Sequence, residues 1–122
     1  RENRYECFLS ADTRLPMMYM DDAIRGTLML MDAPSEAITI RTSYNFTAIS
    51  FTPAELVAEI RKISPDFKII YKPDYRQKIA DSWSQSIDDS QARKDWGWKE
   101  EYDLPKMTTA LYEGIKERIS NE

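Results

Sequence analysis

One arginine stands where its side chain could bind an anion. Arg14 follows Asp12 and Thr13 and comes shortly before Pro16, so we expect it at a bend of the chain. A guanidinium group at such a bend can donate two parallel hydrogen bonds to a carboxylate or a phosphate. Surface arginines without any ligand are common, so the local sequence alone leaves a solvated Arg14 as an open alternative.

Tyr112 and Lys116 are a second candidate pair, because their spacing puts a phenol and an ammonium group on one face of a helix. Short-chain dehydrogenases use a tyrosine and a lysine with this spacing as an acid-base pair. Here the pair lies in a segment with a charged surface pattern, and no glycine-rich cofactor turn precedes it. We therefore reject this pair and predict no catalytic residue in the sequence.

The three tryptophans could form a stacking platform for bases or sugars. Trp96 and Trp98 flank Gly97 at an expected helix end, which predicts packing in a small core instead. Cys7 lies in an apolar run and is expected to be buried as a small apolar residue.

The residue composition excludes several kinds of site. The sequence contains no histidine, which removes serine-histidine and cysteine-histidine pairs and histidine metal ligands. Its three glycines, at positions 26, 97 and 114, are too far apart to form a dinucleotide-binding turn or a P-loop. Asp21 and Asp22 precede a helical pattern and predict a helix start, because two carboxylates without further ligands do not make a metal site.

Charge and hydropathy limit the partners and the location. The net charge of −4 and the pI near 5.0 are unfavourable for binding nucleic acid or anionic lipid, so we predict neither a nucleic acid nor a membrane partner. The longest apolar stretch, residues 15–20, is far shorter than the roughly 18 residues of a membrane span. No signal peptide is visible and there is one cysteine, which together predict a cytoplasmic protein.

Apolar periodicity predicts strands and helices that alternate along the chain in an α/β arrangement, with no domain boundary between them. Residues 52–55 form the clearest helix start, with an N-cap threonine, a first-turn proline and a capping-box glutamate. The segment 75–83 could be a helix or an extended lid. The predicted strands are residues 5–9, 38–46 and 67–71, and the predicted helices are residues 21–32, 53–63, 88–94 and 105–119.

Three stretches resemble one protein family. The runs DTRLPMMYMDD (12–22), SFTPAEL (50–56) and DDSQARKDWGW (88–98) are similar to the C-terminal half of the extended short-chain dehydrogenases/reductases, of the Rossmann-like superfamily. The first run, together with RQKIADSW (76–83), resembles the NAD-dependent L-threonine 3-dehydrogenases of that family. The resemblance extends over nearly the whole sequence.

The resemblance implies that residues 1–122 are one incomplete domain, the substrate-binding half of an enzyme whose glycine-rich cofactor half is absent. It implies oxidation of L-threonine to 2-amino-3-ketobutyrate, NAD bound mainly by the missing half, a homodimer when complete, and no activity of the fragment alone. By the same resemblance Arg14 would bind the substrate carboxylate, with Thr13, Asp12 and Trp83 as further substrate-binding residues.

Two alternatives remain open. One is the C-terminal half of a nucleotide-sugar epimerase or dehydratase, and the other is a non-catalytic binding module. Whether a second chain completes the site is also open. If the helices 21–33 and 105–119 normally pack on the missing half, we expect exposed apolar surface, including Met29 and Met31.

Overall fold

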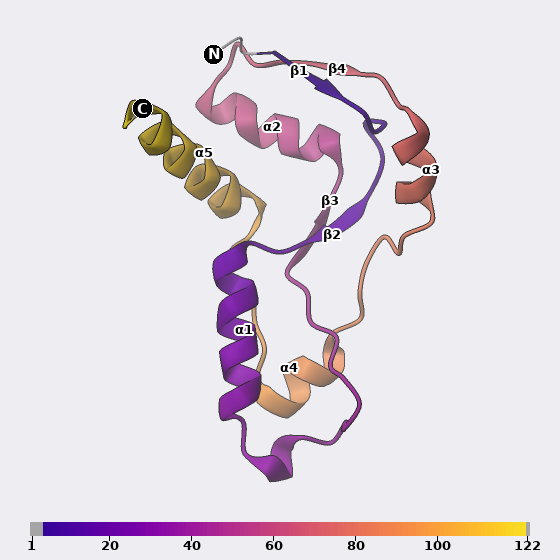
Figure 1. The fold of residues 1–122 in the computed structure, drawn as a ribbon, viewed down its shortest axis with the longest axis vertical. Helices are drawn as coiled ribbons and strands as arrows, with labels where there is room; N and C mark the ends of the chain where they lie inside the picture. Colours follow the sequence, from indigo (N-terminus) through magenta and orange to yellow (C-terminus); the bar gives the residue numbers. More distant parts are fainter. Residues whose placement is uncertain (1–3, 122) are drawn as a thin grey trace.

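The chain forms a mixed α/β structure with two small sheets and an elongated outline (Figure 1). The structure, a computed structural model, describes residues 4–121. Both sheets, α2 and α3 lie in the upper part of Figure 1, whereas α1 and α4 form the lower part. The elements are β1 (Arg4–Cys7), β2 (Leu15–Met17), α1 (Met20–Asp32), the 3-10 helix η1 (Ser35–Ala37), β3 (Ile49–Phe51), α2 (Pro53–Ile63), β4 (Lys68–Tyr71), α3 (Tyr75–Asp81), α4 (Ser90–Trp96) and α5 (Leu104–Ser120).

Each sheet is a single pair of strands that are distant in the sequence. β1 and β4 are parallel, with Arg4 opposite Lys68. β2 and β3 are antiparallel, with Leu15 opposite Phe51. The loop of residues 8–14 therefore connects one sheet to the other, and it contains the arginine singled out above.

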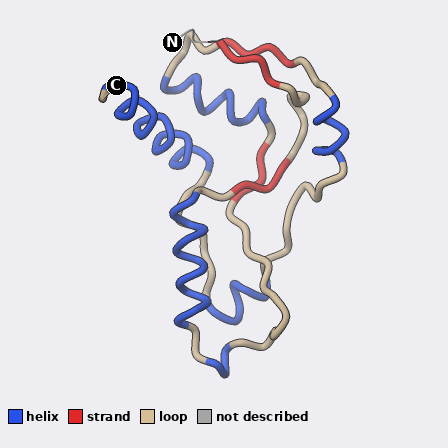
Figure 2. The backbone as a smooth tube through the Cα atoms, viewed as in Figure 1, coloured by secondary structure: helices blue, strands red, loops and turns tan. Residues whose placement is uncertain are grey.

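Two of the predicted strands are confirmed and one is wrong. The run 5–9 overlaps β1, and the run 67–71 contains β4. The predicted strand at 38–46 is instead part of the long loop between η1 and β3, drawn in tan in Figure 2. The amide of Thr39 donates to Tyr44 Oη at 2.9 Å, which bends the run back on itself. Its aromatic residues pack against tryptophans, so its apolar content serves the core and not strand pairing.

The start of α2 follows the predicted capping box. Thr52 Oγ1 accepts a hydrogen bond from the Glu55 amide at 3.3 Å, and Glu55 Oε2 accepts one from the Thr52 amide at 3.1 Å. Pro53 is the first helical residue, where its missing N–H costs no helical hydrogen bond. The capping box fixes both the start of the helix and the direction of the Glu55 carboxylate.

The remaining predicted helices also form. The runs 21–32, 88–94 and 105–119 correspond to α1, α4 and α5, and the open question over 75–83 resolves as the helix α3. Gly97 follows α4 with a φ of 71°, a left-handed conformation that glycine adopts without a steric penalty.

The buried core of the lower part is aromatic. Ala92, Trp96 and Trp98 form a buried cluster, and Phe46 packs edge-on to both tryptophans, with ring centroids 5.7 Å from Trp96 and 5.1 Å from Trp98. The indole N–H of Trp98 donates to Thr47 O at 2.7 Å. The predicted packing role of Trp96 and Trp98 is therefore confirmed, and Cys7 in β1 is buried as expected.

Asp22 has a role that its position at a helix start did not predict. Its side chain is fully buried on α1 and accepts hydrogen bonds from the amides of Glu101 and Tyr102, at 3.0 to 3.1 Å. Arg25 Nη2 donates to the same carboxylate at 3.0 Å, and its guanidinium lies 4.9 Å from the ring centre of Trp98. Asp22 thus attaches the segment between α4 and α5 to α1.

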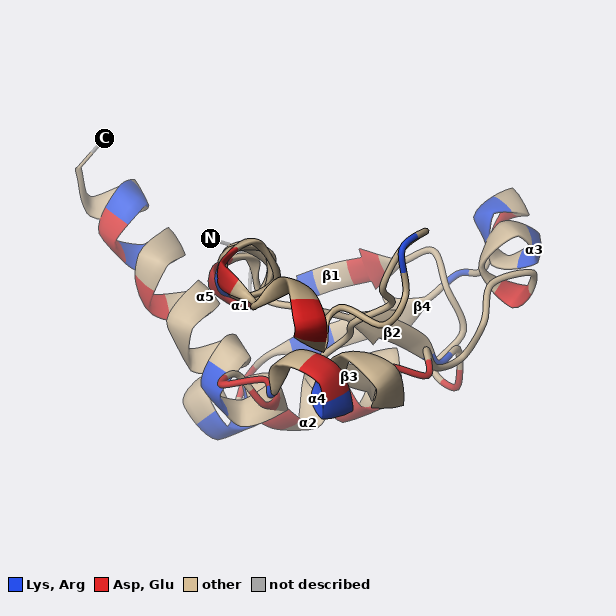
Figure 3. Cartoon of the chain, turned by 90° about the horizontal axis from the view of Figure 1, so that it is seen from below, with Lys and Arg blue, Asp and Glu red and all other residues tan. Residues whose placement is uncertain are grey.

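Two helices leave apolar faces in solvent. On α1 the exposed face is made by Met20, Ile24, Leu28 and Met31, and on α5 by Leu111, Ile115 and Ile119. Figure 3 shows α5 running away from the other elements toward the C-terminus. The expectation of exposed apolar surface is confirmed for Met31, which is 73% exposed, but it is wrong for Met29, which packs against the tryptophan cluster.

Replacing Gly26 by alanine is expected to destabilise the fold by about 1–3 kcal/mol through overpacking of the core. A Cβ atom at this position would lie 2.6 Å from Phe46 Cε2 and 2.8 Å from Trp98 Cζ3, both in side chains of the aromatic cluster. Urea unfolding monitored by tryptophan fluorescence measures the change.

The matched control is Gly114→Ala on α5, where a new Cβ meets no atom within 4 Å. Alanine is the better helix former, so this substitution is expected to stabilise by about 0.5–1 kcal/mol. If both substitutions changed the free energy of unfolding in the same direction, the close approach at Gly26 would be contradicted.

Candidate functional site

The loop of residues 8–14 is held in place by α3. Gln77 is the central contact: its Oε1 accepts from the Ser10 amide at 2.8 Å, and its Nε2 donates to Thr13 Oγ1 at 2.8 Å. Thr13 Oγ1 is also 2.7 Å from Ser10 Oγ. On the other side, the amide of Ala54, in the first turn of α2, donates to Ala11 O at 3.2 Å. The loop is therefore fixed from two directions.

Arg14 is the last residue of this loop and lies against the start of α2. Its Nη1 donates to Ser50 O at 2.8 Å, and its Nη2 donates to Glu55 Oε1 at 2.7 Å. The Arg14 side chain is 37% exposed. A guanidinium group has five N–H donors. Within residues 4–121 two of these bonds are made, so donors remain for an anion arriving from solvent.

The Arg14 guanidinium also lowers the pKa of its partner, Glu55. The hydrogen bond from Arg14 is the largest cause of a lowered pKa of Glu55, and the hydrogen bond from the Thr52 backbone adds to it. Glu55 is therefore ionised at neutral pH. The site combines a fixed carboxylate with a guanidinium that it holds, which suits binding of a small carboxylate ligand.

The four residues predicted to bind substrate differ in their surroundings. Thr13 is buried and bonded to Gln77, whereas Asp12 is exposed beside it. Arg14 is partly exposed at the start of α2. Trp83 follows α3 and is 58% exposed. Asp12, Thr13 and Arg14 are consecutive in one loop, but Thr13 bonds to α3 whereas Arg14 bonds to α2. The contacts found among residues 4–121 do not join Trp83 to them.

Sequence reasoning missed two partners of this loop. Gln77 lies in the run 76–83 that supported the family resemblance, but nothing in its type or spacing indicated a contact with Thr13. Ser50 contributes a backbone carbonyl, which leaves no signal in the residue type. Glu55, which also contacts Arg14, was predicted as a capping residue. The capping box uses one carboxylate oxygen, so the second oxygen was the signal that Glu55 could make another contact.

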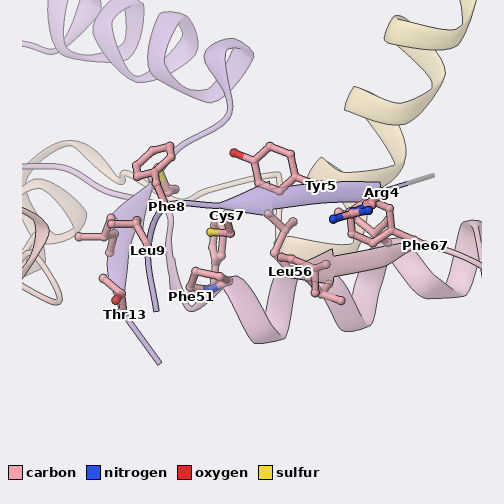
Figure 4. A pocket seen from close by; sticks show the side chains of 15 residues that line it. Arg4, Tyr5, Cys7, Phe8, Leu9, Thr13, Phe51, Leu56 and Phe67 are labelled. Atoms are coloured by element: carbon pink, nitrogen blue, oxygen red, sulfur yellow. The ribbon is translucent and has the colours of Figure 1, made fainter. Parts of the chain in front are cut away.

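A mostly apolar cavity lies near the loop. It has a volume of about 670 Å³ and lies between β1, β4 and α2 (Figure 4). Phe8, Phe51, Leu56 and Phe67 line it, while Thr13 lies at one end. Arg4 is the charged side chain of this lining, and an ionised amino acid would lose much of its hydration among the apolar side chains. Arg14 is not among the residues that line this cavity.

Two kinds of site, a metal cluster and a glycine-rich pyrophosphate turn, were sought among the described residues. Across residues 4–121 there is no group of three or more histidine, cysteine, aspartate or glutamate side chains that could hold a metal ion. Gly97, the glycine with positive φ, follows the end of α4 and does not precede a helix N-terminus. A dinucleotide turn needs glycines that open a helix, so the described residues do not fit the pyrophosphate of a nicotinamide cofactor.

Comparison with known proteins gives close relatives although no family model matches the chain. The mitochondrial L-threonine 3-dehydrogenase of Bos taurus is 50% identical over 123 residues, which cover 98% of this chain and 33% of the bovine protein. An uncharacterised epimerase/dehydratase of Staphylococcus haemolyticus is 44% identical over 100% of this chain and 39% of its own length.

Solved structures agree with the sequence matches. The crystal structure of L-threonine dehydrogenase from Phytophthora infestans superimposes with a TM-score of 0.93 at 47% identity, covering 97% of this chain and 38% of that one. The GalE-like L-threonine dehydrogenase from Cupriavidus necator, in its apo form, gives a TM-score of 0.88 at 53% identity, covering 92% and 40%.

The chain thus spans between a third and two fifths of the length of the relatives it matches. The similarity includes the loop of residues 8–14, because it extends over nearly all of the chain. In sequence and in fold, the chain matches the C-terminal part of the L-threonine 3-dehydrogenases, which are extended, epimerase-like short-chain dehydrogenases/reductases.

Proposed function

We propose that this chain is the substrate-binding part of an NAD-dependent enzyme that oxidises L-threonine to 2-amino-3-ketobutyrate. The observation that supports this best is the 50% identity to the bovine dehydrogenase over 98% of the chain, together with the TM-score of 0.93 to a solved L-threonine dehydrogenase. At such identity the arrangement of a substrate site is commonly retained. Residues 1–122 are one incomplete domain in this proposal.

NAD would supply the hydride acceptor for this oxidation, and the hydroxyl proton would go to a base outside this chain, since no catalytic residue is predicted here. The cofactor is bound mainly by residues outside this chain, in agreement with the three scattered glycines. The residues of this chain bind and orient the amino acid. Arg14 donates to the threonine carboxylate through the N–H groups that Ser50 and Glu55 leave free.

The other predicted site residues receive more specific roles. Thr13 is buried and bonded to Gln77, so it acts by holding the loop at the correct distance and not by touching substrate. Asp12 is exposed beside Arg14 and faces the threonine amine. Trp83 has an exposed ring that can cover the bound substrate once the rest of the enzyme is present.

The test uses the complete enzyme, meaning this chain together with the upstream residues of a full-length dehydrogenase. The complete enzyme is expected to reduce NAD with L-threonine, as followed by the absorbance of NADH, and the chain alone is expected to be inactive. Threonine oxidation by the isolated chain would contradict the proposed division of the active site.

The epimerase alternative rests on the Staphylococcus haemolyticus relative, which is named an epimerase/dehydratase. The same assay with uridine-diphosphate sugars, in place of threonine, separates the two reactions. Turnover of a nucleotide sugar without threonine oxidation would favour the epimerase.

Partners and location stay predictions. Homodimer formation through the part outside this chain is expected, and mass measurement of the complete enzyme tests it. In residues 4–121 no helix has the length and hydropathy needed to cross a membrane. The bovine and porcine relatives are named mitochondrial. The cytoplasmic location proposed for this protein therefore needs a fractionation experiment.

A further inference from the structure

Glu55 makes two contacts that together fix the direction of the Arg14 guanidinium. Its Oε2 is held by the Thr52 amide at 3.1 Å in the capping box, so the carboxylate cannot rotate freely. Its Oε1 accepts from Arg14 Nη2 at 2.7 Å. The helix start therefore positions one carboxylate oxygen, and that oxygen positions the arginine.

A second fixed acceptor prevents the guanidinium from turning about the first contact. Arg14 Nη1 donates to Ser50 O at 2.8 Å, and Ser50 lies in β3, which pairs with the β2 strand that follows Arg14. Two contacts on two different nitrogens define the plane of the group. An arginine side chain that is not held in this way has rotamer entropy to lose on binding a ligand.

We propose that Glu55 is a positioning residue for substrate binding, which holds Arg14 in the orientation that receives the threonine carboxylate. This rests on the proposed role of Arg14. Glu55 does not touch substrate and acts through Arg14 alone. It orders the guanidinium before the substrate arrives, so that binding does not have to supply this ordering.

An opposite effect of Glu55 has to be weighed. Its negative charge weakens the attraction of Arg14 for a second carboxylate, and this effect would make removal of Glu55 favourable for binding. The two side chains are 37% and 46% exposed, so water and salt screen the repulsion strongly. The geometric effect does not depend on screening, and we expect it to dominate.

The test is Glu55→Gln in the complete enzyme. Glutamine keeps an oxygen that can accept from the Thr52 amide, so the helix start is retained, while the charged contact with Arg14 is lost. The KM for L-threonine is expected to rise about five- to tenfold with little change in kcat, since ground-state and transition-state binding are weakened alike. A KM that is unchanged or lowered would overturn the proposal.

Two further variants separate positioning from general damage to the site. Thr52→Ala removes the hydroxyl that caps the Glu55 amide but leaves the Glu55 carboxylate, so it is expected to lower the melting temperature without changing KM. In an Arg14→Ala background, Glu55→Gln is expected to cause no further rise in KM, because the residue it acts through is gone. Additive effects of the two substitutions would contradict a role through Arg14.

The same set of variants distinguishes failure of this inference from failure of the proposed function. If Arg14→Ala raises KM for threonine and Glu55→Gln does not, Arg14 binds substrate without help from Glu55. If neither raises KM, the proposed role of Arg14 is itself wrong and the positioning role falls with it.

Discussion

Replacing Arg14 by alanine in the complete enzyme is expected to raise the KM for L-threonine by about 10- to 100-fold, the effect of losing charged hydrogen bonds of about 1.5–3 kcal/mol. The KM for NAD is expected to stay nearly constant, because the described residues of this chain do not fit the cofactor's pyrophosphate. Steady-state kinetics with each substrate varied in turn measures both constants.

Arg14→Lys is the informative second variant. Lysine keeps the positive charge but lacks the planar fork, so it cannot contact Ser50, Glu55 and a substrate carboxylate in the same geometry. A rise in KM almost as large as that of the alanine variant is expected. Full activity of the lysine variant would show that charge alone is sufficient, and an unchanged KM in both variants would remove Arg14 from the site.

Replacing Asp22 by alanine is expected to destabilise the fold by about 3–5 kcal/mol, because it leaves buried donors without their charged acceptor. The amides of Glu101 and Tyr102 and the guanidinium of Arg25 all lose a partner. The free energy of unfolding of a typical domain is about 5–15 kcal/mol, so this loss is a large fraction of it. The shift of the urea midpoint measures it.

Asp21→Ala is the matched control on the same helical turn. Asp21 is exposed, and its contact with Tyr102 Oη is long, at 3.5 Å. Its removal is expected to cost less than about 1 kcal/mol, mainly through the lost attraction of a carboxylate to the helix N-terminus. Equal losses from the two aspartates would show that both act only as helix-start charges, as the sequence suggested.

The sequence predictions are accurate where the signal lies within a few residues, and they fail where the structure depends on contacts between distant residues. The capping box at residues 52–55 is complete within one turn, and α2 begins there. The run 38–46 has strand-like composition, but its fate depends on Trp96 and Trp98, which lie about 50 residues later. The tertiary contact overrides the local preference, as is common for strand propensity.

The candidate site shows the same limit. Arg14 could be singled out by its residue type and its neighbours, and by the family resemblance. Its partners Ser50 and Glu55 lie 36 and 41 residues away, and Gln77 lies 64 residues from Thr13. Such pairs become neighbours only when the sheets form, so their contacts could not be predicted from spacing.

The parallel pairing of β1 with β4 also determines the order in which the chain can fold. β2, β3 and α2 are all complete by residue 63, whereas β4 (Lys68–Tyr71), the strand that pairs with β1 among residues 4–121, is synthesised later. Closing a loop of about 60 residues costs entropy before the strand hydrogen bonds are gained. Among residues 4–121 the β1–β4 pair is therefore expected to form after the β2–β3 pair, whose strands are closer in the sequence.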